Sequence, residues 1–150
     1  MYDDLVKLIE RSAASFPQPG HGVSPATIEA AERALGIPLP TSYKWWLSTY
    51  GQGEIGGDIL YGLDEDYWGA PDLVTLYQDD QRDCRFPERV LVFYIGNEEL
   101  YYFDARHGLD DHEEYPVYYL DTDTDEPEAY AERFAAFLAR RINEVYGERR

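Results

Sequence analysis

Residues 35–63 read LGIPLPTSYKWWLSTYGQGEIGGDILYGL and alternate signals that end one element with signals that begin the next. Gly36 stands where a preceding helix needs a left-handed cap. Pro38 and Pro40 fix their own φ and keep the residue between them extended. A new helix is therefore expected to begin at Thr41, directly after a rigid turn.

The new helix, expected over residues 41–50, carries an aromatic face. Its large side chains follow the spacing i, i+3, i+4 and i+7 of one helical face, and they are Tyr43, Trp46, Leu47 and Tyr50. The glycine-rich segment 51–57 lacks the Gly-Lys-Ser/Thr ending of a phosphate-binding loop, so its glycines predict turns and close packing. A strand is expected over residues 58–61, after the last of these turns.

Two helices are predicted ahead of this stretch. Residues 3–15 place leucine and isoleucine side chains on one face of the first helix. A loop rich in proline and glycine follows it. Ser24 then caps the second helix, which has Pro25 at its first position and extends to residue 35.

The second half of the chain predicts strands between two helices. A short helix is expected from residues 71–72 to the polar run at residues 79–83, after an exposed acidic loop. Apolar runs rich in strand formers predict three strands, the first two as a hairpin, over residues 89–95, 100–104 and 115–120. The longest helix is expected from about residue 127 to residue 146, because its aromatic and aliphatic residues recur on one face.

This order of helices, antiparallel strands and a closing helix is typical of the α+β class. We therefore expect a single domain over residues 1–150, in which the N-terminal helices and a long C-terminal helix pack on a mostly antiparallel, curved sheet. A chain of this length buries about 70% of its unfolded surface, which is enough for one core.

The charge balance is strongly acidic. The chain has 30 Asp and Glu residues against 13 Lys and Arg residues, a net charge of −17. Nucleic acids and anionic membranes bind proteins through cations, so both are excluded as partners, whereas basic proteins, cationic ligands or metal ions are favoured. The 14 Tyr, 6 Phe and 3 Trp residues argue against disorder.

Cysteine use and the N-terminus predict a cytoplasmic protein. The single cysteine, Cys84, permits no internal disulfide and has no evident base beside it, so an inert thiol is expected. Residues 1–10 carry acids where a signal peptide needs basic residues. No apolar run in the sequence approaches the length of a membrane span.

Several short patterns follow one another along nearly the whole chain, and their order is more informative than any one of them. They are Ile28–Leu35, Gly36–Pro40, Tyr43 with Leu47, Tyr50-Gly51, Gly56-Gly57, Ile59–Leu63, Leu91–Phe93, Tyr101–Asp104, Pro116–Tyr118, and Phe134 with Leu138. In this order the chain resembles the SUKH superfamily, which contains Syd and the yeast cell-wall regulators of the Smi/Knr type. It departs from relatives at residues 97–99, where a glycine-containing turn is common.

The resemblance implies an immunity protein, because bacterial relatives mostly bind the toxic domain of a secreted or contact-delivered toxin. Such toxin domains are often nucleases or deaminases, and stoichiometric binding blocks them without turnover. The resemblance therefore implies no enzyme activity and no cofactor. Other relatives are regulatory scaffolds, so a protein-interaction scaffold of the cell-wall regulator type is the alternative function.

Two acidic segments are candidates for binding this partner. A nuclease domain holds phosphates on a face that is usually basic, and acids beside aromatic side chains suit such a face. The candidate partner-binding residues are Asp64, Glu65, Asp66, Tyr67, Trp68, Asp110, Asp111, Glu113 and Glu114. The alternative interpretation is a solvated rim of loops without a partner.

A metal site is the weakest of the alternatives. Residues 121–132 imitate a calcium loop, with acids at alternate positions and Glu132 at the twelfth. Glu126 replaces the glycine needed at the sixth position, so we favour a role for the acids of 121–128 at the positive N-terminus of the last helix. Three histidines are expected as isolated surface residues, with a transition-metal pair as the alternative: His21, His107 and His112.

Overall fold

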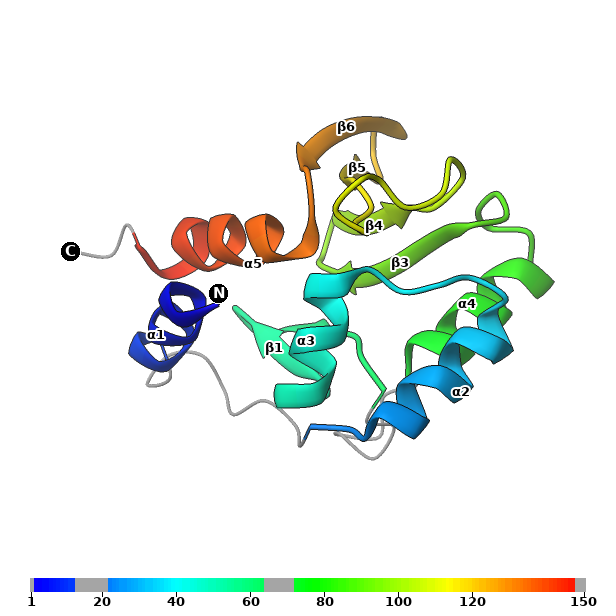
Figure 1. Ribbon diagram of the computed structural model, residues 1–150. Coiled ribbons are helices and arrows are strands. Elements are labelled where there is room, and N and C mark those ends of the chain that lie inside the picture. Colours follow the sequence, from blue (N-terminus) through cyan, green and yellow to red (C-terminus); the bar gives the residue numbers. More distant parts are fainter. Residues whose placement is uncertain (1, 13–21, 64–71, 148–150) are drawn as a thin grey trace.

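The computed structural model describes residues 2–12, 22–63 and 72–147 (Figure 1). The elements in chain order are α1 (Asp3–Arg11), α2 (Pro25–Leu35), α3 (Thr41–Thr49), β1 (Gly53–Ile55), β2 (Asp58–Leu60), α4 (Leu73–Arg82), β3 (Val90–Ile95), β4 (Glu99–Asp104), β5 (Val117–Asp121), β6 (Glu126–Ala131) and α5 (Phe134–Ile142). A π-helical segment, η2 (Asn143–Gly147), continues α5. The α+β class predicted from the sequence is confirmed.

Local sequence signals begin and end the helices as predicted. The Ser24 side chain accepts a hydrogen bond from the Thr27 N–H at 3.2 Å, and Pro25 is the first residue of α2. Gly36 ends α2 at a φ of 69°, the left-handed cap that glycine tolerates best. Asp72 caps α4 through the same type of hydrogen bond as Ser24, at 2.9 Å.

The described strands form one antiparallel meander in the order β1-β2-β3-β4-β5-β6. The predicted hairpin is β3–β4, with Leu91 opposite Phe103 and Ile95 opposite Leu100. Pro116 directly precedes β5, at a strand entry where its missing N–H costs no ladder hydrogen bond. Each strand pairs with the next in sequence, so β1 and β6 are the two edges.

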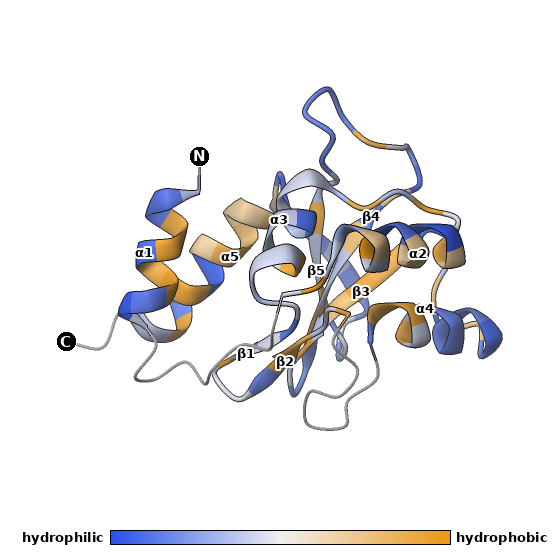
Figure 2. Ribbon diagram, turned by 60° about the horizontal axis from the view of Figure 1, so that its bottom comes forward, coloured by the Kyte–Doolittle hydropathy of each residue, from blue (hydrophilic) through white to orange (hydrophobic). Residues whose placement is uncertain are grey.

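The main core lies between the sheet and the helices α3 and α5. Tyr43 of α3 and Phe134 of α5 have ring centroids 5.0 Å apart, and Phe103 of β4 lies 5.1 Å from Tyr43. On the opposite face, Leu76 of α4 packs on a smaller cluster that includes Val92. Strand β3 therefore runs between two apolar layers, and Figure 2 shows it in hydrophobic colours through the middle of the fold.

Two neighbouring tyrosines on β4 show that both sheet faces are covered. Tyr101 is 1% exposed and belongs to the main core, whereas Tyr102 is 6% exposed and belongs to the smaller cluster. Tyr102 stacks on Tyr118 of β5 with a centroid distance of 5.6 Å. Successive strand residues point to opposite faces, so the pair can be buried together because each face has its own cover.

The long C-terminal helix predicted from residue 127 to residue 146 is wrong in its first part. Residues Glu126–Ala131 are strand β6, and α5 spans Phe134–Ile142. Asp125, at a φ of 58°, turns the chain back so that β6 pairs with β5. Tyr130 fits a helical face as well as a strand face, so the apolar spacing could not separate the two structures.

Strand β1 was also missed, because the glycines at residues 51–57 predicted turns and close packing and no strand. Its three residues pair with β2, and Glu54 lies opposite Ile59. The Tyr94 hydroxyl donates to the Ile55 carbonyl at 2.9 Å, which fixes the end of β1 against the main core.

Candidate functional site

The loop between β4 and β5 carries four of the acids singled out from the sequence, and Asp110 sets its shape. The Asp110 carboxylate accepts hydrogen bonds from the backbone N–H groups of His112, at 2.8 Å, and of Glu114, at 3.0 Å. Its own N–H donates to the Glu114 carbonyl at 2.9 Å. The Asp110 side chain is therefore a structural element of the loop.

Asp111 and Glu113 are exposed acids of the same loop. Glu113 has a φ of 58°, and its carbonyl accepts a hydrogen bond from the Thr41 N–H at 3.0 Å. This bond ties the loop to the first turn of α3. The loop thus presents two carboxylates to solvent from a backbone that is anchored on both sides.

Glu114 is not an exposed acid, unlike its two neighbours. Its side chain is 4% exposed, and its carboxylate accepts hydrogen bonds from the Ser42 N–H at 2.8 Å and the Ser42 hydroxyl at 2.9 Å. The Ser42 Oγ in turn accepts from the Ala135 N–H at 3.0 Å. This chain of hydrogen bonds joins the loop, α3 and the first turn of α5, so Glu114 positions all three.

Burial raises the pKa of the Glu114 carboxyl, while the Ser42 hydrogen bonds and the charge of Arg133 act in the opposite direction. Burial also raises the pKa values of Glu54 and Asp80. An acid with a raised folded-state pKa holds its proton more tightly in the folded chain, so its protonation stabilises the fold. This contribution grows as pH falls through the folded-state pKa and is lost as pH rises.

We therefore expect the melting temperature to rise by about 3 °C, or roughly 1 kcal/mol, between about pH 8 and about pH 5.5. Protonation of the buried carboxyls and relief of the −17 net charge both act in this direction. Asp104, whose pKa is lowered by its hydrogen bond with Arg106, loses its contribution at more acidic pH. Calorimetry across this range measures the effect, and Glu114→Gln should show a smaller rise. A melting temperature that falls steadily over the range would contradict the prediction.

A groove of about 670 Å³ lies beside this loop, between α1 and α5. Helix α1 contributes Leu5 and Leu8 to its lining, and α5 contributes Ala135, Ala136 and Ala139. Alanine side chains are short, so this face of α5 does not fill the space in front of it. The groove was not predicted from the sequence, although the alanine spacing in α5 indicates a small-residue face.

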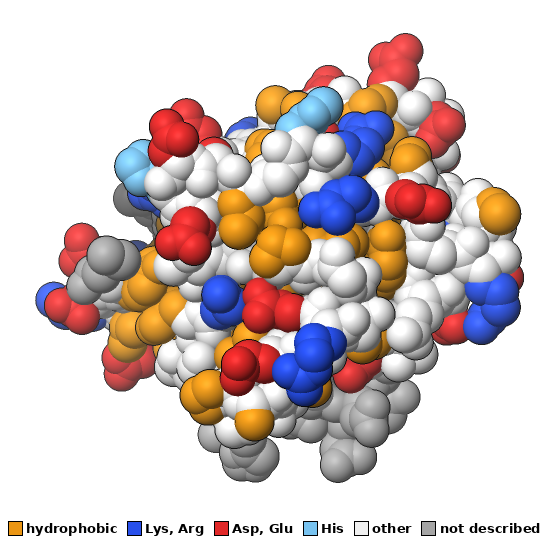
Figure 3. All heavy atoms as spheres, turned by 45° about the vertical axis from the view of Figure 1, so that its right-hand side comes forward, with side chains coloured by type: hydrophobic (Ala, Val, Ile, Leu, Met, Phe, Trp, Pro, Cys, Tyr) orange, Lys and Arg blue, Asp and Glu red, His pale blue; other side chains and the backbone are white. Residues whose placement is uncertain are grey.

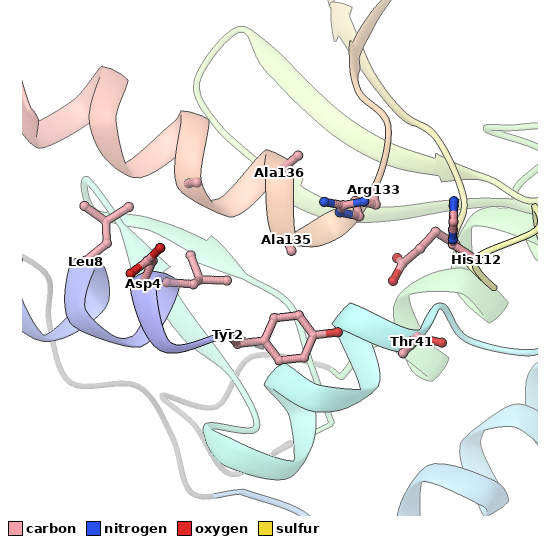
Figure 4. A pocket seen from close by; sticks show the side chains of 11 residues that line it. Tyr2, Asp4, Leu8, Thr41, His112, Arg133, Ala135 and Ala136 are labelled. Atoms are coloured by element: carbon pink, nitrogen blue, oxygen red, sulfur yellow. The ribbon is translucent and has the colours of Figure 1, made fainter.

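Polar groups gather at one end of the groove. Figure 4 shows Tyr2 lying across it, with Arg133 and His112 at the end nearest the β4–β5 loop. The Tyr2 ring stacks on Trp45 with a centroid distance of 4.4 Å. Burial and the charge of Glu114 raise the pKa of Tyr2, and the charge of Arg133 opposes them. Tyr2, Glu114 and Arg133 are thus electrostatic neighbours.

The sequence predicted that the acids at residues 121–128 lie at the N-terminus of the last helix. This prediction is wrong, because these residues form the β5–β6 hairpin and α5 begins only at Phe134. The Asp121 carbonyl accepts from the Asp125 N–H at 2.8 Å, and the Asp121 carboxylate accepts from the Asp123 N–H at 2.8 Å. The residue at the N-cap of α5 is Arg133. Within the described ranges, no group of three or more His, Cys, Asp or Glu side chains is arranged to hold a metal ion.

Acidic residues are concentrated along one side of the sheet. Residues 107–132 contain ten acids and no Lys or Arg, and they form the β4–β5 loop, β5, the hairpin turn and the edge strand β6 (Figure 1). Asp123, Glu126 and Glu128 are exposed there. Elsewhere the charges are mixed, and Figure 3 shows a face with Lys and Arg side chains among acids and apolar patches.

The segment Asp64-Glu65-Asp66-Tyr67-Trp68 and His21 lie outside the described residues. His107 and His112 are exposed. Cys84 is exposed at a φ of 54°.

A family model described as the SMI1 / KNR4 family (SUKH-1) matches residues 22–140. The chain belongs to the SMI1/KNR4 family. The resemblance to the SUKH superfamily inferred from the sequence is thereby confirmed. No curated protein matches the chain.

The SMI1/KNR4 match includes the whole sheet, the acidic β4–β5 loop and β5–β6 hairpin, and most of α5. It begins after α1, which supplies one wall of the groove. Among the described residues of this SMI1/KNR4 protein, no helix combines the length and apolar character needed to cross a membrane.

Proposed function

We propose that this SMI1/KNR4 family protein is an immunity protein that binds a cognate bacterial toxin domain and blocks it stoichiometrically. The observation that carries the proposal is the run of ten acids without a basic residue in residues 107–132. A toxin domain that acts on nucleic acid, such as a nuclease or a nucleobase deaminase, needs a basic face to hold phosphates. An acidic protein can cover that face without catalysis.

The acids of this side are displayed on preformed structure. Asp110 closes the β4–β5 loop, and Asp121 closes the hairpin turn through its own hydrogen bonds. Little ordering of these segments is then needed on binding, which leaves more of the interaction free energy for affinity. We expect an interface of roughly 1,600 Å² in total, to which the acidic and aromatic segment at residues 64–68 is proposed to add contacts.

Charge reversal of exposed acids on this side should slow association with a basic toxin domain. For the double variants Asp111→Lys/Glu113→Lys and Asp123→Lys/Glu128→Lys we expect the association rate constant to fall by about tenfold or more, because opposite fields steer the encounter. The wild-type rate should also fall as salt rises from about 20 mM to about 500 mM. Where a neighbouring gene encodes a toxin domain, stopped-flow binding to that domain measures both effects.

Glu10→Lys/Glu88→Lys is the matched control, because it makes the same change in net charge at exposed acids outside residues 107–132. It should keep an association rate close to that of the wild type. Reversal of Asp64, Glu65 and Asp66 tests the segment outside the described residues in the same assay. Equal rates for all variants, or a rate indifferent to salt, would remove the electrostatic part of the proposal. Absence of binding and of cellular protection would favour the regulatory scaffold.

A further inference from the structure

We infer that the groove between α1 and α5 receives one aromatic side chain, tyrosine or tryptophan, of the bound toxin domain. The inference rests on the proposed function and adds an anchoring site to the electrostatic surface. The groove has a volume of about 670 Å³. Ligand pockets in proteins have volumes of about 300–1,000 Å³, so a large side chain can be buried in this groove. Dominant contacts of protein interfaces are commonly aromatic side chains held in such pockets.

The floor of the groove favours an apolar, planar group. Ala136 is exposed and Ala135 and Ala139 are half-buried, while Leu5 and Leu8 form the facing wall. An inserted ring would therefore lie between alanine methyl groups and leucine side chains, and this apolar area would leave water on binding. A small polar ligand would leave the same surfaces without a partner.

The polar end of the groove selects an aromatic ring with a hydrogen-bond donor. Arg133 is exposed, and no ion pair within the described part of the chain includes its guanidinium, so it is available to lie over a ring face. The Glu114 carboxylate lines the same end and keeps lone pairs beyond the two hydrogen bonds from Ser42. A tyrosine hydroxyl or an indole N–H can donate to it.

The apolar lining of the groove disfavours the other anchors. A carboxylate would meet Glu114 and Asp4 beside Arg133, and the head of a lysine or arginine would lose hydration among the alanine and leucine side chains. An aliphatic side chain would cover the polar groups at this end of the groove without giving them a hydrogen-bond partner. The exposed acids Asp111 and Glu113 stand in the adjoining loop, so basic residues flanking the aromatic anchor would meet carboxylates at the rim.

Nuclear magnetic resonance titration with p-cresol and indole tests the groove without the toxin. We expect both probes to shift the backbone amide signals of Ala135, Ala136 and Ala139, and toluene, which has no donor, to shift them less. Ala136→Leu fills the space from an exposed helical position and should abolish these shifts. Ala30→Leu, at an exposed position of α2, is the matched control and should keep them. Absence of shifts at these alanines in the wild type would overturn the inference.

Binding of the toxin domain separates this inference from the proposed function. Ala136→Leu should raise the Kd by about tenfold through faster dissociation, while the salt dependence of association stays as in the wild type. Unchanged affinity of a correctly folded Ala136→Leu variant would overturn the groove as an anchor and leave the electrostatic proposal standing. Failure of the wild-type protein to bind any toxin domain would contradict the proposed function, and p-cresol shifts at the alanines would still support an aromatic site.

Discussion

Gly62→Ala is expected to cost more than about 4 kcal/mol of folding free energy, a large share of the about 5–15 kcal/mol that stabilises a typical domain. A Cβ at this position would lie 1.7 Å from the Gly51 carbonyl oxygen and 3.1 Å from the Trp46 ring. The backbone cannot easily move away, because the Gly62 N–H donates to the Gln52 side chain at 2.9 Å and its carbonyl accepts from the Leu73 N–H at 2.7 Å. Urea unfolding followed by circular dichroism measures the loss.

Gly57→Ala supplies the comparison for Gly62→Ala. Gly57 has a φ of 91°, yet a Cβ there would meet nothing within 4 Å. Its replacement should therefore carry the left-handed backbone penalty alone, about 1–2 kcal/mol. A Gly62→Ala protein as stable as Gly57→Ala would show that the backbone around residue 62 can relax, contrary to the close approach seen in the structure.

Phe134→Ala is expected to destabilise the protein by about 3–5 kcal/mol, the usual cost of deleting a fully buried phenylalanine. Phe134 is the first residue of α5, and its ring lies 5.0 Å from Tyr43 and 5.7 Å from both Trp46 and Phe93. The ring thus joins α5 and α3 to β3. Urea unfolding should show a lower midpoint with an unchanged m-value, because the surface exposed on unfolding hardly changes.

Phe86→Ala is the control for this deletion. Phe86 is half-buried and packs on the smaller cluster behind the sheet. Its loss should cost clearly less than that of Phe134, because less apolar surface is buried there. Equal losses in the two variants would mean that the aromatic cluster around Tyr43 does not dominate the stability of the fold.

Elements governed by local chemistry could be predicted from the sequence. Ser24, Gly36 and Asp72 act on neighbours within a few residues, so their capping roles follow from residue type and position. The apolar run of β3 and its return strand β4 follow from composition in the same way. These features placed α2, the start of α4 and the central hairpin correctly.

Elements governed by distant partners could not be predicted in this way. Strand β6 exists because β5 satisfies its backbone groups, and the spacing around Tyr130 was equally consistent with a helix. Glu114 is buried because Ser42, 72 positions earlier in the chain, supplies both of its hydrogen bonds. The groove depends on α1 and α5 coming together from opposite ends of the sequence. The exposure of the candidate acids Asp111 and Glu113 could be predicted from the sequence, since exposed loop residues need no distant partner.

The edge strand β6 also bears on how copies of this protein behave toward one another. Among the described strands β6 has a neighbour on one side, so its other side offers unpaired backbone groups that could template cross-chain pairing. Pro127 removes one of the donors that such pairing needs, and the exposed Glu126 and Glu128 would confront the same carboxylates of an approaching copy. The acids proposed to attract a toxin therefore also oppose edge-to-edge pairing between copies of this protein, which would otherwise lead to fibrillar self-association.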